Sequence, residues 1–132
     1  MKQYILDTDM SIDYLRGSAE TARRIKAVGL PYFRLSEITI AELKYGAAKS
    51  KRPEHNRKEV DTFCSEFAIV PIRPALDVFA FEKARLEKLG TRLDDFDLLI
   101  GATAIHYSFI LVTGNVQHFE RMQNLALENW KE

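Results

Sequence analysis

The sequence predicts an α/β fold in which a central parallel sheet of four to five strands is flanked by helices, giving three layers. Short, almost continuous apolar runs alternate along the chain with longer segments of helical periodicity. Parallel strands buried on both faces read as continuous apolar runs, and helices join them. With 132 residues, 46% hydrophobic and 29% charged, the chain has the size and composition of one globular domain over residues 1–132.

The first part of the chain predicts two strands and three helices. The strands are expected over residues 3–6 and 33–35. A short helix is expected over 12–15, a second from the capping residue Ser18 to Val28, and a third from Ser36 to Ala48. Gly17 and Gly29 follow the first two helices, as glycine commonly does at a helix end.

The second part continues the alternation. Pro53 suits the first turn of a helix, and the apolar residues that follow recur at helical spacing: Val60, Phe63, Cys64 and Phe67. Further strands are predicted over 68–72 and 109–113, and further helices over 74–89 and 97–107. Gly90 ends the long helix that Pro74 begins.

Three acids stand among Leu and Ile residues. Asp7 ends the first strand, Glu42 lies inside an apolar stretch of the third helix, and Asp97 begins the last helix. Such positions are costly for a carboxylate, and local helix capping explains Glu42 poorly. The carboxyl ends of parallel strands meet at one edge, where Asn115 also follows a strand. We therefore expect these residues to converge and to bind a divalent cation.

The chain has no net charge, with 19 basic and 19 acidic residues, but the charges are unevenly distributed. A basic segment over 44–58 contains four candidate polyanion-binding residues: Lys44, Lys49, Lys51 and Arg52. Acids crowd instead over 94–97. The basic segment would hold a polyanion near an acid-bound metal, or else it is an ordinary solvated helix surface.

Composition argues against a membrane or secreted protein. No apolar stretch approaches the roughly 20 residues that a membrane span needs. The first residues lack the basic-then-apolar pattern of a signal peptide. Cys64 is the only cysteine, so it forms no internal disulfide, which fits a reducing compartment. We expect a cytoplasmic protein.

Four segments together resemble the PIN-domain ribonucleases, and in order and spacing the VapC-type toxins of toxin–antitoxin modules. They read ILDTD at 5–9, SxxTxxELxxG at 36–46, DLLIGAxA at 97–104 and VTGNxxxF at 112–119. Each segment alone is weak, but four in order within one domain are specific. The resemblance spans essentially the whole chain and implies a PIN-like three-layer sandwich.

Carried over by position, the resemblance makes Asp7, Glu42 and Asp97 the metal-binding acids. Its fourth catalytic position, often aspartate, is Asn115 here, which contributes an oxygen ligand but no charge. Supporting roles fall to hydroxyls and to acids that would offset that missing charge: Thr39, Thr113, Asp9 and Asp95. Oxygen ligands favour Mg²⁺ or Mn²⁺ over zinc.

The resemblance also implies an activity and partners. Its members cut RNA with Mg²⁺ or Mn²⁺, leaving a 5′-phosphate and a 3′-hydroxyl, and initiator tRNA is the leading expectation for the substrate. A small cognate antitoxin would insert Arg or Lys among the acids and cover Ile12, Leu15 and Tyr45. A homodimer is also common in the family.

Two alternatives stay open at this stage. Asp7, Asp9 and Ser11 after an apolar strand also resemble the opening of haloacid-dehalogenase-type phosphatases, although that reading leaves Glu42 unexplained. Alternatively, Asn115 marks a PIN-like domain that binds RNA or protein without catalysis. Near the site, His118 is a candidate RNA contact, whereas Trp130 is expected to be an anchoring or partner contact.

Overall fold

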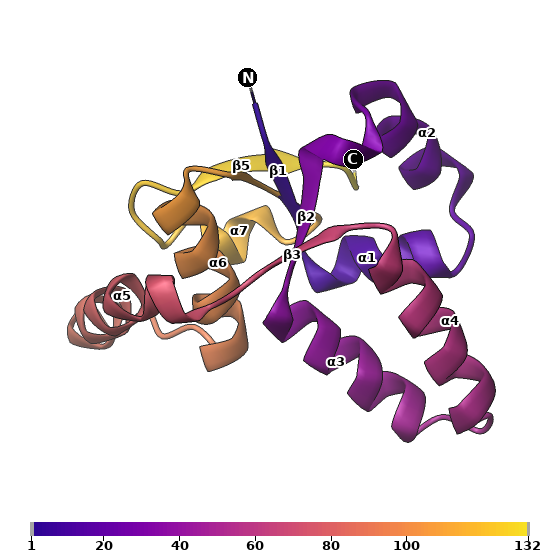
Figure 1. Ribbon diagram of the computed structural model, residues 1–132. Helices are drawn as coiled ribbons and strands as arrows, with labels where there is room; N and C mark the ends of the chain where they lie inside the picture. The colour runs from indigo at the N-terminus through magenta and orange to yellow at the C-terminus, as the bar shows by residue number, and fades with distance from the viewer. Residues whose placement is uncertain (1, 132) are drawn as a thin grey trace.

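The computed structural model describes residues 2–131, in which five parallel strands form one sheet in the order β3-β2-β1-β4-β5 (Figure 1). The strands are β1 Tyr4–Leu6, β2 Phe33–Ser36, β3 Ala68–Val70, β4 Ile110–Thr113 and β5 Ala126–Asn129. The predicted α/β sandwich with a central parallel sheet is confirmed.

Helices connect the strands and cover both faces of the sheet. Their bounds are α1 Thr8–Leu15, α2 Ala19–Val28, α3 Glu37–Ala48, α4 Pro53–Ser65, α5 Leu76–Lys88, α6 Asp95–Tyr107 and α7 Val116–Phe119, with 3₁₀ turns η1 Leu30–Tyr32 and η2 Arg73–Ala75. Helices α1 to α4 lie on one side of the sheet, and α5 to α7 lie on the other (Figure 1). Within residues 2–131, no helix has both the length and the apolar character needed to cross a bilayer.

The two-sided burial of β1 explains its continuous apolar sequence. Tyr4 and Leu6 belong to the core beneath α1 to α4, whereas Ile5 belongs to the core beneath α5 to α7. Successive side chains of a strand point to opposite faces, so every residue of this central strand must be apolar. The layers therefore follow directly from the sequence pattern.

Helix starts agree with the predicted capping residues, with one informative shift. The hydroxyls of Ser18 and Ser36 accept backbone N–H bonds at the starts of α2 and α3, and Pro53 begins α4. Helix α1 begins at Thr8 rather than Ile12, because Asp7 itself is its N-cap and Asp9 lies in its first turn. Residues 8–11, which precede the helix expected over 12–15, are thus helical as well.

Three other boundaries differ from the prediction. Strand β3 ends at Val70 and η2 follows, so α5 begins at Leu76 instead of Pro74. Helix α6 begins at Asp95, two residues before the expected start, because Asp94 caps it. The sequence did not predict α7, and it did not place β5.

The strand order creates a crevice at one point. From β1 the chain moves through β2 to β3 on one side, and then returns to place β4 and β5 on the other. Strands β1 and β4 pair in parallel, with Leu6 opposite Val112. The crevice beyond their carboxyl ends is where open α/β sheets bind ligands. Asp7 and Thr113–Asn115 occupy it.

Candidate active site

Asp7 is the most tightly held acid of the site. Its side chain is 5% exposed, and its backbone N–H donates to the Val112 carbonyl of β4 at 2.9 Å. The Thr8 N–H donates to one carboxylate oxygen and the Thr113 hydroxyl to the other, each at 2.8 Å. Thr113 in turn accepts the Asn115 N–H at 3.0 Å. These bonds fix both oxygens of Asp7 and the turn after β4.

Glu42 reaches the site through Thr8. The Thr8 hydroxyl donates to Glu42 Oε1 at 2.6 Å and lies 3.1 Å from the Thr39 hydroxyl. A hydroxyl has one proton, so Thr39 donates to Thr8 in this arrangement. Thr8 therefore joins α1 to α3, a role that the sequence analysis did not assign. In the sequence, the only feature that pointed to such a role was the position of Thr8 between Asp7 and Asp9.

Asp97 enters from α6 and is paired with a histidine. It lies in the first turn of that helix, and its Oδ2 is 3.1 Å from Nε2 of His118 on α7. His118 was expected only as a candidate RNA contact, whereas the structure places it against a predicted metal-binding acid. Its position three residues after Asn115 brings it to the same sheet edge.

Burial and mutual repulsion raise the pKa values of all three acids. Burial, and then the charges of Asp9 and Asp97, raise the pKa of Asp7 to about 7 despite its hydrogen bonds. Burial also raises the pKa of Glu42, with added repulsion from Asp97 and Asp94, and the pKa of Asp97, with added repulsion from Asp94 and Asp9. The His118 side chain opposes the increase at Asp97. The acids thus share one electrostatic environment, as the sequence predicted.

Asp9 and Asn115 border this cluster. Asp9 Oδ2 accepts the Gly114 N–H at 3.0 Å, whereas its Oδ1 is buried without a hydrogen-bond partner among residues 2–131. Asn115 is exposed at the start of α7, directly after the turn. Asp9 is therefore placed where its charge acts on Asp7, in agreement with a supporting role.

Asp95 is not brought into the cluster. Its carboxylate lies 2.9 Å from the Lys83 ammonium on α5 and is largely exposed. The neighbouring Asp94 instead caps α6, accepting the Phe96 N–H, and its charge acts on Glu42 and Asp97. The structure therefore places Asp95 beside Lys83 and not in the cluster, where it was expected, because α6 begins earlier than predicted.

The four predicted RNA-binding residues are divided by the structure. Lys44 faces α4, with its ammonium 4.0 Å from Asp61, and Lys49 lies over the Tyr45 ring at 4.7 Å. Lys51 and Arg52 are exposed in the turn between α3 and α4. Of the four, only Lys51 and Arg52 are exposed without an ion pair or an aromatic partner among residues 2–131.

A groove runs from Glu42 to Lys49 at the end of α3. Its volume is about 740 Å³, and its walls come from α1, α3 and α4. Thr8 and Glu42 lie at its acidic end, and Lys49 and Ser50 lie further along α3. Ile12, Leu15 and Tyr45, the apolar residues expected to receive an inhibitor, line it together.

The donor set fits a hard divalent cation held partly through water. Within the described residues, no three His, Cys, Asp or Glu side chains lie close enough to form a complete ligand set by themselves. Mg²⁺, however, usually keeps several waters and takes only one or two protein carboxylates. The acids offer oxygen atoms only, and a cation would relieve the repulsion that raises their pKa values.

Comparisons with known proteins give the same picture. The PIN domain family matches residues 4–125. Ribonuclease VapC2 of Haemophilus influenzae is 36% identical over 132 residues, covering 98% of this chain and 99% of the relative. The tRNA(fMet)-specific endonuclease VapC of Salmonella typhimurium is 29% identical over 131 residues, covering 98% and 99%. DNA-bound VapBC from Salmonella typhimurium contains a chain that superimposes with a TM-score of 0.92 at 29% identity, covering 98% of this chain and 99% of that one.

The phosphatase alternative finds no support in these comparisons. The Glu42 segment, which that alternative left unexplained, falls within the matched region and reaches the site through Thr8. The PIN-domain family model matches most of the chain and a VapC ribonuclease is 36% identical over nearly its full length, so the chain belongs to the PIN-domain family, in the VapC ribonuclease group.

Proposed function

We propose that this chain is the toxin of a toxin–antitoxin pair and cleaves RNA with Mg²⁺ or Mn²⁺ held by Asp7, Glu42 and Asp97. One observation carries the proposal: acids from three separate elements act electrostatically on one another at the β1–β4 crevice, where burial and neighbouring carboxylates raise their pKa values. Such a cluster is costly without a cation and favourable with one. The match to VapC ribonucleases supports RNA as the substrate.

The chain's own residues orient the reacting groups. Thr8 and Thr113 hold the oxygens of Asp7, and Thr8 also holds Glu42. When bound, Mg²⁺ or Mn²⁺ supplies a Lewis acid that polarises the phosphodiester and lowers the pKa of the attacking water. The RNA backbone would approach along this groove from the side of the α3–α4 turn, where the exposed Lys51 and Arg52 favour a polyanion.

Chelation and one substitution test this proposal. Purified protein is incubated with RNA in excess chelator, with Mg²⁺ restored, and with Asp97→Asn in place of the wild type. We expect cleavage only for the wild type with metal, while circular dichroism shows the same fold for both proteins. Full cleavage in chelator would refute the metal mechanism.

For the substrate, we propose initiator tRNA. The support is the relative from Salmonella typhimurium, a tRNA(fMet)-specific endonuclease. Mapping RNA 5′ ends in cells after induction of the wild type and of Asp7→Ala tests this directly. New ends in the anticodon stem-loop of initiator tRNA, present only with the wild type, are expected, and ends confined to ribosomal RNA would contradict it.

For the partner, we propose a small antitoxin that occupies the groove. The solved relative from Salmonella typhimurium is a VapBC complex, and VapBC is a family of toxin–antitoxin systems. A basic side chain of the inhibitor would pair with Glu42, while its apolar side chains cover Ile12 and Leu15. Co-expression with the adjacent small reading frame should relieve growth arrest, and the two proteins should co-purify.

The homodimer expected from the family is also part of this proposal. Light scattering of the purified chain, alone and with the antitoxin, measures the mass of each species. A mass of twice the 15.2 kDa chain is the expected result for the toxin alone.

A further inference from the structure

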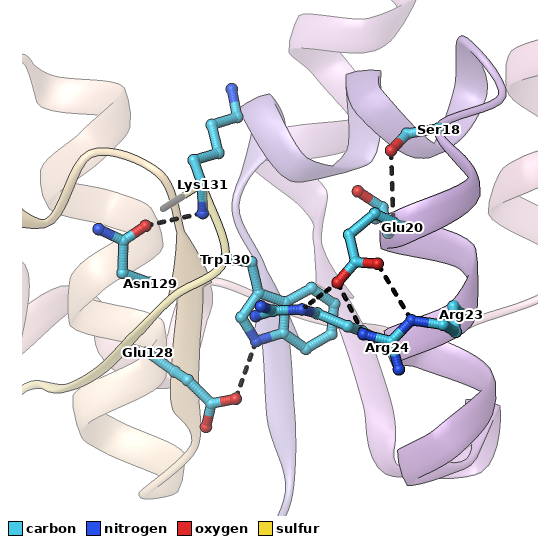
Figure 2. Close-up of polar contacts among 9 residues, drawn as sticks. Ser18, Glu20, Arg23, Arg24, Glu128, Asn129, Trp130 and Lys131 are labelled. Atoms are coloured by element: carbon cyan, nitrogen blue, oxygen red, sulfur yellow. Dashed lines mark hydrogen bonds and ion pairs between the residues drawn. The ribbon is translucent and has the colours of Figure 1, made fainter.

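The segment that follows β5 is anchored by polar contacts around Trp130 (Figure 2). Trp130 is buried, its ring meets Phe33 edge-on at 5.8 Å, and its Nε1 donates to Glu128 at 2.8 Å. The Arg24 guanidinium of α2 lies 5.6 Å from the same ring. This packing fixes the backbone directly before Lys131.

The anchoring residues are themselves held in place. Glu20 binds both Arg23, at 2.7 Å, and Arg24, at 3.0 Å, so the cation beside the Trp130 ring has a defined position (Figure 2). The Lys131 N–H donates to the Asn129 side chain at 2.9 Å. The direction in which the Lys131 side chain leaves is therefore set by the fold.

That side chain runs across the site's rim to two acids of α1. Its ammonium nitrogen lies 3.6 Å from Asp9 Oδ2 and 3.6 Å from Asp13 Oδ2. Its aliphatic part covers Gly114, where a Cβ atom would collide with it. Gly114 is thus the residue that lets a cation reach Asp9.

Asp9 connects this cation to the catalytic acids. Its Oδ2 also accepts the Gly114 N–H, and Gly114 lies between Thr113, which donates to Asp7, and Asn115. The Asp9 charge adds to the repulsion on Asp7 and Asp97. A cation on Asp9 therefore acts on the whole cluster.

We propose that Lys131 is a positioning residue of the active site: its ammonium neutralises Asp9 and sets how strongly the cluster attracts a metal ion. This inference rests on the proposed metal dependence. The alternative is a purely structural role. Asp9 and Asp13 are like charges four residues apart on α1, and Lys131 also reduces the repulsion between them.

Metal affinity distinguishes the two roles, measured by calorimetric titration with Mn²⁺ alone. Lys131→Met keeps the aliphatic part and removes the charge, so Mn²⁺ should bind about three- to tenfold more tightly. Lys131→Arg should restore the wild-type affinity. Lys88→Met, at an exposed position on α5, is the matched control and should change nothing.

Combining Lys131→Met with a substitution of Asp9 or Asp13 shows through which acid Lys131 acts on Mn²⁺ binding. With Asp9→Asn, Lys131 loses its partner at the rim of the site, so adding Lys131→Met should tighten Mn²⁺ binding clearly less than it does in the wild type. With Asp13→Asn, only the structural partner is gone, so the full three- to tenfold effect should persist. Equal effects in the two backgrounds would overturn the proposal, as would unchanged affinity in Lys131→Met.

The same titration separates this inference from the proposed function. If the wild type fails to bind Mn²⁺ and matches Asp7→Asn, the metal mechanism and the role of Lys131 both fail. If the wild type binds Mn²⁺ and Asp7→Asn does not, while Lys131→Met behaves as wild type, only the role of Lys131 fails.

Discussion

Two buried carboxylates, Asp7 and Glu82, show how differently this fold treats the same chemical group. Their side chains are 5% and 3% exposed. Glu82 receives two bonds from the Arg85 guanidinium, at 2.6 and 2.9 Å, and one from the Gln123 N–H at 2.7 Å. Hydrogen bonding from Arg85 lowers the pKa of Glu82. Asp7 has only neutral donors and acidic neighbours, and its pKa is raised.

The difference separates a structural acid from a functional one. Glu82 is neutralised within the fold and joins α5 to the segment before β5, where Arg85 also binds the Arg121 carbonyl. No cation of the fold contacts Asp7 within the described residues, so its ionised form is costly in the metal-free protein and its pKa is raised. Burial alone would not have distinguished the two residues, whereas their partners do.

The largest expected effect concerns activity. Asp7→Asn should lower kcat/KM for RNA cleavage by about a thousandfold or more, because it removes a metal-binding oxygen and charge from the site. Glu82→Gln should leave kcat/KM near the wild-type value. A fluorogenic RNA assay with Mg²⁺ at saturating concentration measures both, and equal losses in the two variants would break the distinction.

Stability should respond in the opposite sense. Glu82→Gln removes charged hydrogen bonds from a buried group and should reduce the free energy of unfolding by about 2 kcal/mol. Asp7→Asn relieves repulsion and should raise it by about 1 kcal/mol without metal. Urea unfolding in chelator gives both values. Destabilisation by Asp7→Asn would show that its hydrogen bonds outweigh the repulsion.

Asp7 and Glu82 should also have opposite effects on how the free energy of unfolding changes with pH. The pKa of Asp7 rises from 3.8 to about 7 on folding, so the folded protein retains a proton that the unfolded chain releases. The free energy of unfolding should therefore fall as pH rises from about 4 to 7. Glu82 behaves oppositely: its lowered pKa stabilises the fold above pH 4.5, and that contribution is lost as pH falls further.

Two variants show which residue causes each pH dependence of the free energy of unfolding. In chelator, Asp7→Asn should flatten the decline between pH 4 and 7, and Glu82→Gln should reduce the loss below pH 4.5. Urea midpoints measured at half-unit intervals follow both. A wild-type protein that grows more stable from pH 4 to 7, in the same way as Asp7→Asn, would contradict the raised pKa of Asp7.

The smallest expected effect concerns RNA binding, and it compares basic residues that have a partner in the fold with basic residues that have none within the part of the chain that the structure describes. Lys44 and Lys49 already have partners, whereas Lys51 and Arg52 lie exposed in the α3–α4 turn. Charge reversal at Lys51 and Arg52 should weaken RNA binding and reduce the log–log salt slope by roughly 0.7 to 0.9 per lost phosphate contact. Lys88→Glu, on α5, is the control. An unchanged slope would mark the turn as an ordinary solvated surface.

The sequence predicted the parts of the fold that local pattern determines. The strand Tyr4–Leu6 is apolar throughout because it is buried on both faces, and Ser36 and Pro53 begin helices as expected. The strand Ala126–Asn129 went unplaced because it is a partly exposed edge strand with mixed polarity, held by pairing with β4. The four-residue helix α7 is too short to show periodicity.

In the site too, the sequence predicted the residues that stand out locally and missed those that depend on distant contacts. Asp7, Glu42 and Asp97 stood out because acids among apolar residues are unusual in any sequence. Thr8 and His118 act through contacts with distant segments, which no local pattern reveals. Position along the chain also could not decide between Asp94 and Asp95, because one residue of helix phase determines which carboxylate faces the cluster.

The bond from Thr113 to Asp7 spans 106 positions of the chain, and Glu42 and Asp97 lie between them in sequence. Contacts of such long sequence separation form late, after the loops between them have closed. A growing polypeptide on the ribosome therefore carries the acids separately long before they can cooperate. The complete cluster therefore exists only after β4 has been synthesised and has paired with β1.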